Sequence, residues 1–176
     1  MYLRTIAAIV GCVVVWTPQV EAAFTGCYAP DQWTFYSDGD ESNQGSGALT
    51  TDQMTVLGMD GQHFYHGLAY YSVTACADAM LSFHWVFASE DQDEFDRAMY
   101  RINGGEPIFI GNWVPGEGDL QVAVSAGDVF DLGVWTEDAL TGPGTLVVTQ
   151  FVPEPSALLM LLPGLLLVSR RRRTAV

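Results

Sequence analysis

Carboxylates are the most concentrated of the chemically active side chains in this sequence. Two short segments hold them at a density that suits calcium: Glu90, Asp91, Asp93, Asp96, Glu137 and Asp138. Calcium binds about six to eight oxygen ligands, and two acidic loops at one end of a β-sandwich would supply them. The first segment is not an EF-hand, because Phe95 stands where an oxygen ligand is required. We therefore expect either a calcium site or a solvated acidic surface.

The sequence carries none of the common catalytic motifs. Residues 45–47 (Gly-Ser-Gly) lack the spacing of a nucleophile elbow, and the sequence has no phosphate-binding loop or zinc-protease helix motif. Nothing in the spacing of His63, His66 and His84 brings them to one metal. The acidic residues are so abundant that no pair stands out as a sugar-hydrolysing pair. We predict no catalytic residues and a non-enzymatic protein, with a secreted polysaccharide hydrolase as the alternative.

Aromatic residues suggest carbohydrate binding as a further possibility. Trp33, Trp113 and Trp135, together with several tyrosines, would offer ring faces to a sugar. Most large aromatic residues of a β-sandwich are nevertheless core residues. We expect Trp113, which lies beside Asn112 and a Pro-Gly turn, to be the most exposed of the three.

Charge narrows the choice of partners. The chain has 21 acidic and seven basic residues, with a net charge of −14. Only two of the basic residues, Arg97 and Arg101, lie between the two ends of the chain that read as targeting signals. Such a surface repels phosphate backbones, so we expect no binding to nucleic acid.

The pattern of apolar residues predicts an all-β domain over residues 23–151. Residues 79–88 alternate strictly, with Leu81, Phe83, Trp85 and Phe87 on one face, as in a half-buried antiparallel strand. Residues 99–102 with 107–114, and residues 120–124 with 130–134, are predicted to form two hairpins. Residues 37–51 are expected to be a loop, and 145–151 a final strand. Eight or nine short strands favour an antiparallel β-sandwich, most simply a jelly roll.

The N-terminus has the composition of a secretory signal peptide. Arg4 precedes an apolar run over residues 6–16, and small residues follow Pro18, so we expect cleavage after Ala22. A lipid-modified Cys12 is the alternative, although the apolar run continues beyond it. Export would leave Cys27 and Cys76 as an even pair in an oxidising compartment, where we expect a disulfide rather than two thiols or a bridge to a partner.

The C-terminal residues 152–176 combine three features in a fixed order. First comes the motif Val152, Pro153, Glu154 and Pro155. A short apolar run over residues 157–168 follows, somewhat shorter than the roughly 20 residues of a usual membrane-spanning helix. A basic cluster comes last: Arg170, Arg171, Arg172 and Arg173. By the positive-inside rule this cluster would stay in the cytoplasm and the domain would lie outside.

This order of features resembles the PEP-CTERM sorting signal of Gram-negative and related bacteria. The resemblance implies signal peptidase and an exosortase as processing enzymes, a transient stay in the inner membrane, and cleavage near the Pro-Glu-Pro motif. It also implies a final place at the cell surface or in an extracellular matrix, among exopolysaccharides. Residues 79–151 look like the extracellular jelly-roll, CUB-like modules that often precede such signals. An anchor that is never cut is the alternative.

Overall fold

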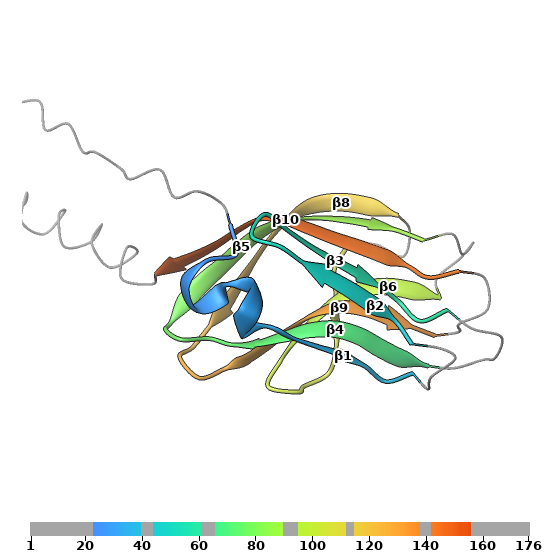
Figure 1. The fold of residues 1–176 in the computed structure, drawn as a ribbon, viewed down its shortest axis with the longest axis horizontal. Helices are drawn as coiled ribbons and strands as arrows, with labels where there is room; N and C mark the ends of the chain where they lie inside the picture. Colours follow the sequence, from blue (N-terminus) through green and yellow to red (C-terminus); the bar gives the residue numbers. More distant parts are fainter. Residues whose placement is uncertain are drawn as a thin grey trace, which may run out of the picture.

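A computed structural model describes residues 23–39, 44–60, 66–89, 95–111, 115–137 and 142–155, and its strands form two antiparallel β-sheets. Figure 1 shows the two sheets packed face to face. The first sheet has the strand order β1-β4-β9-β6-β7, and the second has the order β2-β3-β10-β5-β8. The expected all-β antiparallel sandwich is confirmed.

Within these described ranges, the elements follow one another as two short 3₁₀ helices and ten strands. They are η1 (Gly26–Tyr28), η2 (Pro30–Gln32), β1 (Thr34–Ser37), β2 (Ser46–Leu49), β3 (Gln53–Leu57), β4 (Gly67–Thr74), β5 (Ala79–Ala88), β6 (Asp96–Ile102), β7 (Ile108–Phe109), β8 (Gly116–Val124), β9 (Val129–Thr136) and β10 (Thr145–Pro155).

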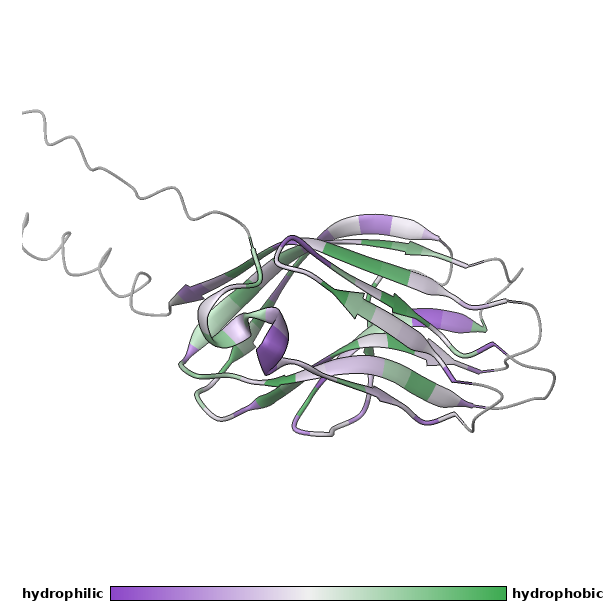
Figure 2. Ribbon diagram, viewed as in Figure 1, coloured by the Kyte–Doolittle hydropathy of each residue, from purple (hydrophilic) through white to green (hydrophobic). Residues whose placement is uncertain are grey.

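The core lies between the sheets and follows from the alternation of the strands. In β5 the four predicted inward residues, Leu81, Phe83, Trp85 and Phe87, are all buried. Figure 2 shows hydrophobic and hydrophilic residues alternating along the strands. Alternate residues of a strand point to opposite faces of its sheet, so each strand contributes one row to the core and one row to an outer face.

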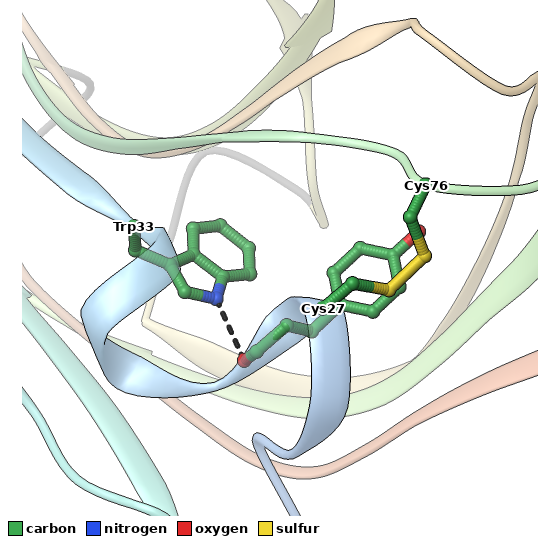
Figure 3. Close-up of a disulfide and its surroundings, with 4 residues drawn as sticks. Cys27, Trp33 and Cys76 are labelled. Carbon is green, nitrogen blue, oxygen red and sulfur yellow. Dashed lines mark hydrogen bonds between the residues drawn. A yellow bond between two sulfur atoms is a disulfide. The ribbon is translucent and has the colours of Figure 1, made fainter.

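One end of the core is closed by the N-terminal 3₁₀ helices. The ring of Phe24 stacks on that of Phe151, with centroids 4.7 Å apart, and Trp33 meets both edge-on. The indole Nε1 of Trp33 donates a hydrogen bond to the carbonyl of Tyr28 (Figure 3). The predicted disulfide between Cys27 and Cys76 is confirmed, and it ties η1 to the segment between β4 and β5.

Two expectations about connections are wrong. Strands β8 and β9 do not form a hairpin, because β8 pairs with β5 in the second sheet whereas β9 pairs with β4 and β6 in the first. Both strands carry an inward row of apolar residues. Such a row can face the core from either sheet, so it does not determine which sheet the strand joins. The expected loop over residues 37–51 contains the short strand β2, which pairs with β3. The other predicted hairpin forms, as β6 with the two residues of β7.

The last strand continues through the proposed sorting motif. β10 pairs with β5 along its whole length, but with β3 only as far as Thr149. A bulge separates Thr149 from Val152, and Gln150 has a φ of 55° there. Beyond the bulge, the edge of β10 that faced β3 has no paired strand in the described sheet. Pro153 and Pro155 lie in this segment, where a strand with one open edge tolerates residues without an N–H donor.

The remaining predicted segments lie outside the described residues. These are the signal peptide (1–22), the apolar run (157–168) and the basic cluster Arg170 to Arg173. Within the part of the chain that the structure describes, no helix has the length and hydrophobicity needed to cross a membrane.

Candidate functional site

A row of five residues crosses the outer face of the first sheet from edge to edge. The pairing register aligns Tyr36, Tyr70, Gly133, Met99 and Phe109 on β1, β4, β9, β6 and β7. Residues directly opposite one another in neighbouring strands share a face of the sheet. The two ends of the row are exposed aromatic residues, since Tyr36 is 48% and Phe109 40% exposed. We call this row and its two flanking rows the aromatic face.

The middle of the row has no side chain, and glycine is required there. A Cβ on Gly133 would collide with the backbone carbonyl oxygen of Ala69 and would lie 2.6 Å from the Cα of Tyr70. On one side of Gly133, the ring of Tyr70 stacks on that of Tyr36 with centroids 5.4 Å apart. On the other side Met99 is fully buried although it belongs to an outer face. The side chains of this face therefore pack against one another and shield part of the face from solvent.

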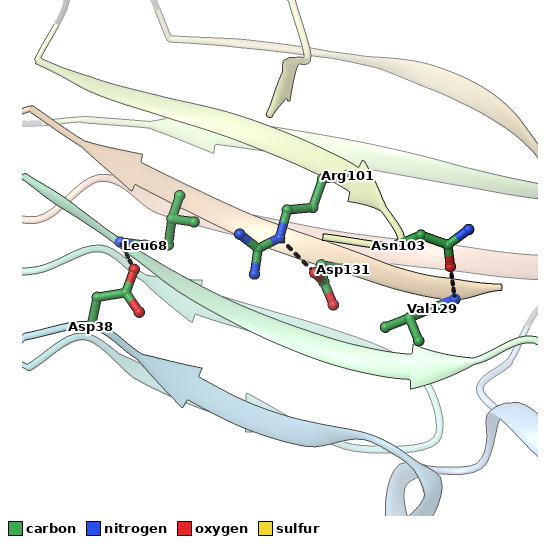
Figure 4. A network of polar contacts seen from close by, with 6 residues as sticks. All are labelled: Asp38, Leu68, Arg101, Asn103, Val129 and Asp131. Atoms are coloured by element: carbon green, nitrogen blue, oxygen red, sulfur yellow. Dashed lines mark hydrogen bonds and ion pairs between the residues drawn. The ribbon is translucent and has the colours of Figure 1, made fainter. Parts of the chain in front are cut away.

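A buried ion pair flanks the row on one side. Arg101 Nε donates to Asp131 Oδ2 over 2.6 Å, and the two side chains are only 17% and 4% exposed (Figure 4). The guanidinium also lies over the ring of Tyr70, 4.4 Å from its centroid. Burial raises the pKa of Tyr70, and the positive charge of Arg101 counteracts part of that effect. The other carboxylate oxygen of Asp131 has no hydrogen-bond partner among the described residues.

The second arginine is surrounded by rings on the other side of the row. Arg97 lies directly opposite Trp135 in the β6–β9 register. Its guanidinium carbon is 4.6 Å from the ring centroid of Phe109 and 5.2 Å from that of Trp135. Contacts of this kind hold an arginine in one orientation through cation–π attraction. Both arginines of the domain thus lie on the aromatic face, in an otherwise acidic molecule.

This arrangement suits a ligand that combines apolar ring faces with hydroxyl or carboxylate groups. Exposed rings at the two ends offer stacking surfaces, and fixed guanidinium groups between them offer hydrogen-bond donors. The row spans four inter-strand spacings of about 4.8 Å, so roughly 19 Å in all. It therefore matches an extended ligand better than a single small molecule.

The candidate calcium residues are only partly within the described chain. Glu90, Asp91, Asp93 and Asp138 lie outside it. Asp96 begins β6 and is buried, and its Oδ2 lies 3.4 Å from the hydroxyl of Ser89. The backbone N–H of Glu137 donates to the carbonyl of Phe95, which brings the ends of the two acidic segments together. Among the described residues, no three His, Cys, Asp or Glu side chains are grouped as metal ligands would be. The calcium hypothesis stays a prediction.

The other predicted residues are placed as follows. His63, Asn112 and Trp113 lie outside the described chain, and Trp33 is a core residue. Trp135 belongs to the aromatic face.

His84 lies on the outer face of the second sheet. Its Nδ1 bonds Asp119 Oδ1 over 2.9 Å, and Ser82 precedes it on the same face of β5. The Ser82 hydroxyl has no hydrogen-bond partner in the described part, so no bond joins it to His84.

The sequence analysis did not predict that these residues form one face. The alternation of Arg97, Met99 and Arg101 with Ala98 and Tyr100 does place the first three on one side of a strand. The pairing of this strand with β9, more than 30 residues further along the chain, was the missing information.

Comparison with known proteins identifies no family. No family model matches the chain, and no curated protein matches it. Among solved structures, it is similar to the secreted serine protease VesC of Vibrio cholerae, with 10% identity, a TM-score of 0.46, and coverage of 65% of this chain and 25% of that one. Tailspike protein 4 of bacteriophage CBA120 gives 9% identity and a TM-score of 0.38, covering 70% of this chain and 19% of that one.

A family 35 carbohydrate-binding module from Clostridium thermocellum gives 14% identity and a TM-score of 0.35, covering 69% of this chain and 94% of that one. The chain thus spans a quarter or less of the length of VesC and of the tailspike protein. All of these similarities are too distant to indicate a function.

Proposed function

We propose that this protein is a non-enzymatic carbohydrate-binding protein of the cell exterior, and that the aromatic face binds an extracellular polysaccharide. One observation carries the proposal. The register of five strands aligns exposed rings at both edges of a sheet with both arginines of the domain between them.

The test is binding of soluble oligosaccharides to the full chain, measured by isothermal titration calorimetry. Hexasaccharides of glucose, galactose and galacturonate serve as probes, because they separate neutral from acidic sugars. Replacing an exposed stacking ring should remove part of the contact, so Phe109→Ala and Tyr36→Ala should each weaken binding about tenfold. Disaccharides of the same sugars should bind more weakly, since they do not span the face.

The matched control is Ile108→Ala. Ile108 is the neighbour of Phe109 on β7 and is 50% exposed, but its side chain belongs to the opposite face of the strand. This variant should bind as the parent does. If no probe binds, or if Ile108→Ala weakens binding as much as Phe109→Ala, the aromatic face is not a carbohydrate site.

The proposal includes delivery to the exterior by the two terminal signals. Its support is the order of the Val152 to Pro155 motif, the apolar run and the arginine cluster. Intact-mass analysis of protein recovered from outside the producing cell tests it. A C-terminus near Pro153 to Ser156 would support exosortase processing, whereas a chain that still carries Arg170 to Arg173 would contradict it.

The jelly-roll form of the sandwich is part of the same proposal. Its support is that consecutive strands from β3 to β6 and from β8 to β10 alternate between the two sheets. Alternation of this kind is what a double-sheet Greek-key arrangement requires.

A further inference from the structure

A groove of about 350 Å³ lies on the outer face of the second sheet, on the opposite side of the sandwich from the aromatic face. Strands β5, β8 and β10 form it, and its polar side chains are Ser82, His84, Asp119, Gln121, Gln150 and Glu154. The register places His84 opposite Asp119 and Ser82 opposite Gln121, so both pairs share the outer face. The volume is at the lower end of the range of ligand pockets, which is about 300–1,000 Å³.

The bulge in β10 shapes this groove. Gln150 and Phe151 together oppose the single residue Phe83 of β5. This extra residue lets Phe151 point into the core while Val152 takes its place on the outer face. Gln150 adopts a positive φ of 55°, a conformation that costs free energy for any residue with a side chain. A bulge of this type re-aims side chains beside functional sites.

The polar groups of the groove supply both donors and acceptors. The Nδ1 of His84 is engaged with Asp119, which leaves its Nε2 for another partner. Ser82 lines the groove, and its hydroxyl oxygen is buried and bonds no other group in the described chain. The amides of Gln121 and Gln150 each present one donor group and one acceptor. Asp119 and Glu154 add carboxylate acceptors, and neither arginine nor lysine lines the groove.

We propose that this groove is a second binding site, and that it takes a neutral sugar unit through its hydroxyl groups. Neighbouring hydroxyls of a sugar each donate and accept, which matches this mixture of groups. The two carboxylates repel phosphate and uronate groups. The site does not depend on the aromatic face, and a protein that has both would connect two polysaccharide chains.

The experiment uses the full chain in a zwitterionic detergent that carries no sugar headgroup. Methyl glycosides of glucose, galactose and mannose are titrated, and the side-chain amide signals of Gln121 and Gln150 are followed by NMR. Saturable shifts of these two signals with a neutral glycoside are expected, whereas methyl galacturonate should cause none. Phe109→Ala should leave the titration unchanged, which separates this site from the aromatic face.

Gln150→Gly is the informative variant. Glycine adopts a positive φ without strain, so this change removes the amide while keeping the bulge and the stability. It should weaken binding about tenfold, the effect of losing one hydrogen bond, and His84→Ala should act in the same direction. The proposal is overturned if none of the neutral glycosides shifts the amide signals. It is also overturned if Gln150→Gly binds as the parent does, or if calcium shifts these signals and the sugars do not.

Discussion

A close pair of a basic and an acidic side chain lies on the outer face of each sheet, and the two pairs differ in their surroundings rather than in their distances. On the first sheet Arg101 and Asp131 are 2.6 Å apart and are 17% and 4% exposed. On the second sheet His84 and Asp119 are 2.9 Å apart and are 28% and 85% exposed. The first pair is buried, with the guanidinium of Arg101 over the ring of Tyr70, whereas the second is open to water. Burial decides how much such a pair contributes to stability. Water screens the attraction in an exposed pair, whereas a buried charge that loses its partner is left without solvation.

Removing Arg101 should have the largest effect. Arg101→Met leaves Asp131 buried without its partner, so we expect the free energy of unfolding to fall by about 3 kcal/mol. Urea denaturation followed by tryptophan fluorescence measures it. The double variant Arg101→Met with Asp131→Leu should recover most of the loss, since no buried charge remains. A single-variant loss below about 1 kcal/mol would show that the pair behaves as an exposed one.

Filling the centre of the aromatic face should have the next largest effect. Gly133→Ala forces a Cβ against the backbone of β4, and we expect a loss of about 2 kcal/mol in the free energy of unfolding. Gly105→Ala is the matched control, because its Cβ would meet only the carbonyl of Ile102, at 3.1 Å. Equal effects of the two changes in the same denaturation experiment would contradict the close packing of this face.

Removing His84 should have a small effect on stability. His84→Ala breaks a pair whose carboxylate is exposed, so we expect a change of about 0.5 kcal/mol or less. A loss above about 1.5 kcal/mol would remove the contrast between the two faces.

The smallest effect is expected at alkaline pH. Burial raises the pKa of Tyr70, so the folded state holds this proton more tightly than the unfolded state does. The resulting stability is fully present below about pH 10, the ordinary tyrosine value, and is lost as the pH rises through the raised pKa. Tyr70→Phe should therefore show a shallower loss of stability above pH 10, measured by urea denaturation at stepwise pH. An identical slope in the parent and the variant would contradict this assignment.

The sequence predicted the parts of the fold that depend on the local pattern of residues and on the oxidising compartment expected for an exported protein. The alternation of β5 predicted its inward row, and the even pair of cysteines predicted the disulfide. The pattern did not predict which sheet β8 or β9 would join, because both faces of the core accept the same apolar row. The aromatic face was missed for a related reason. Tyr36, Tyr70 and Phe109 meet only through the register of strands far apart in the sequence.

The groove was missed because it depends on a backbone conformation. Nothing in the order Thr149, Gln150 and Phe151 indicates a bulge, since glutamine is not a residue that favours a positive φ. The bulge becomes necessary once Phe151 must reach the core and Val152 must continue the pairing with β5. Requirements of packing and pairing that act together at one point leave no local pattern in the sequence.

The last four residues of β10 also affect how these molecules behave toward one another. A strand with an open edge can recruit a strand from a second molecule and so start aggregation. Pro153 and Pro155 alternate with Val152 and Glu154 on that edge, and neither proline has an N–H to offer. Glu154 is exposed and adds a negative charge. The Pro-Glu-Pro sequence therefore protects the sandwich against edge-to-edge association at high local concentration, whatever else it does.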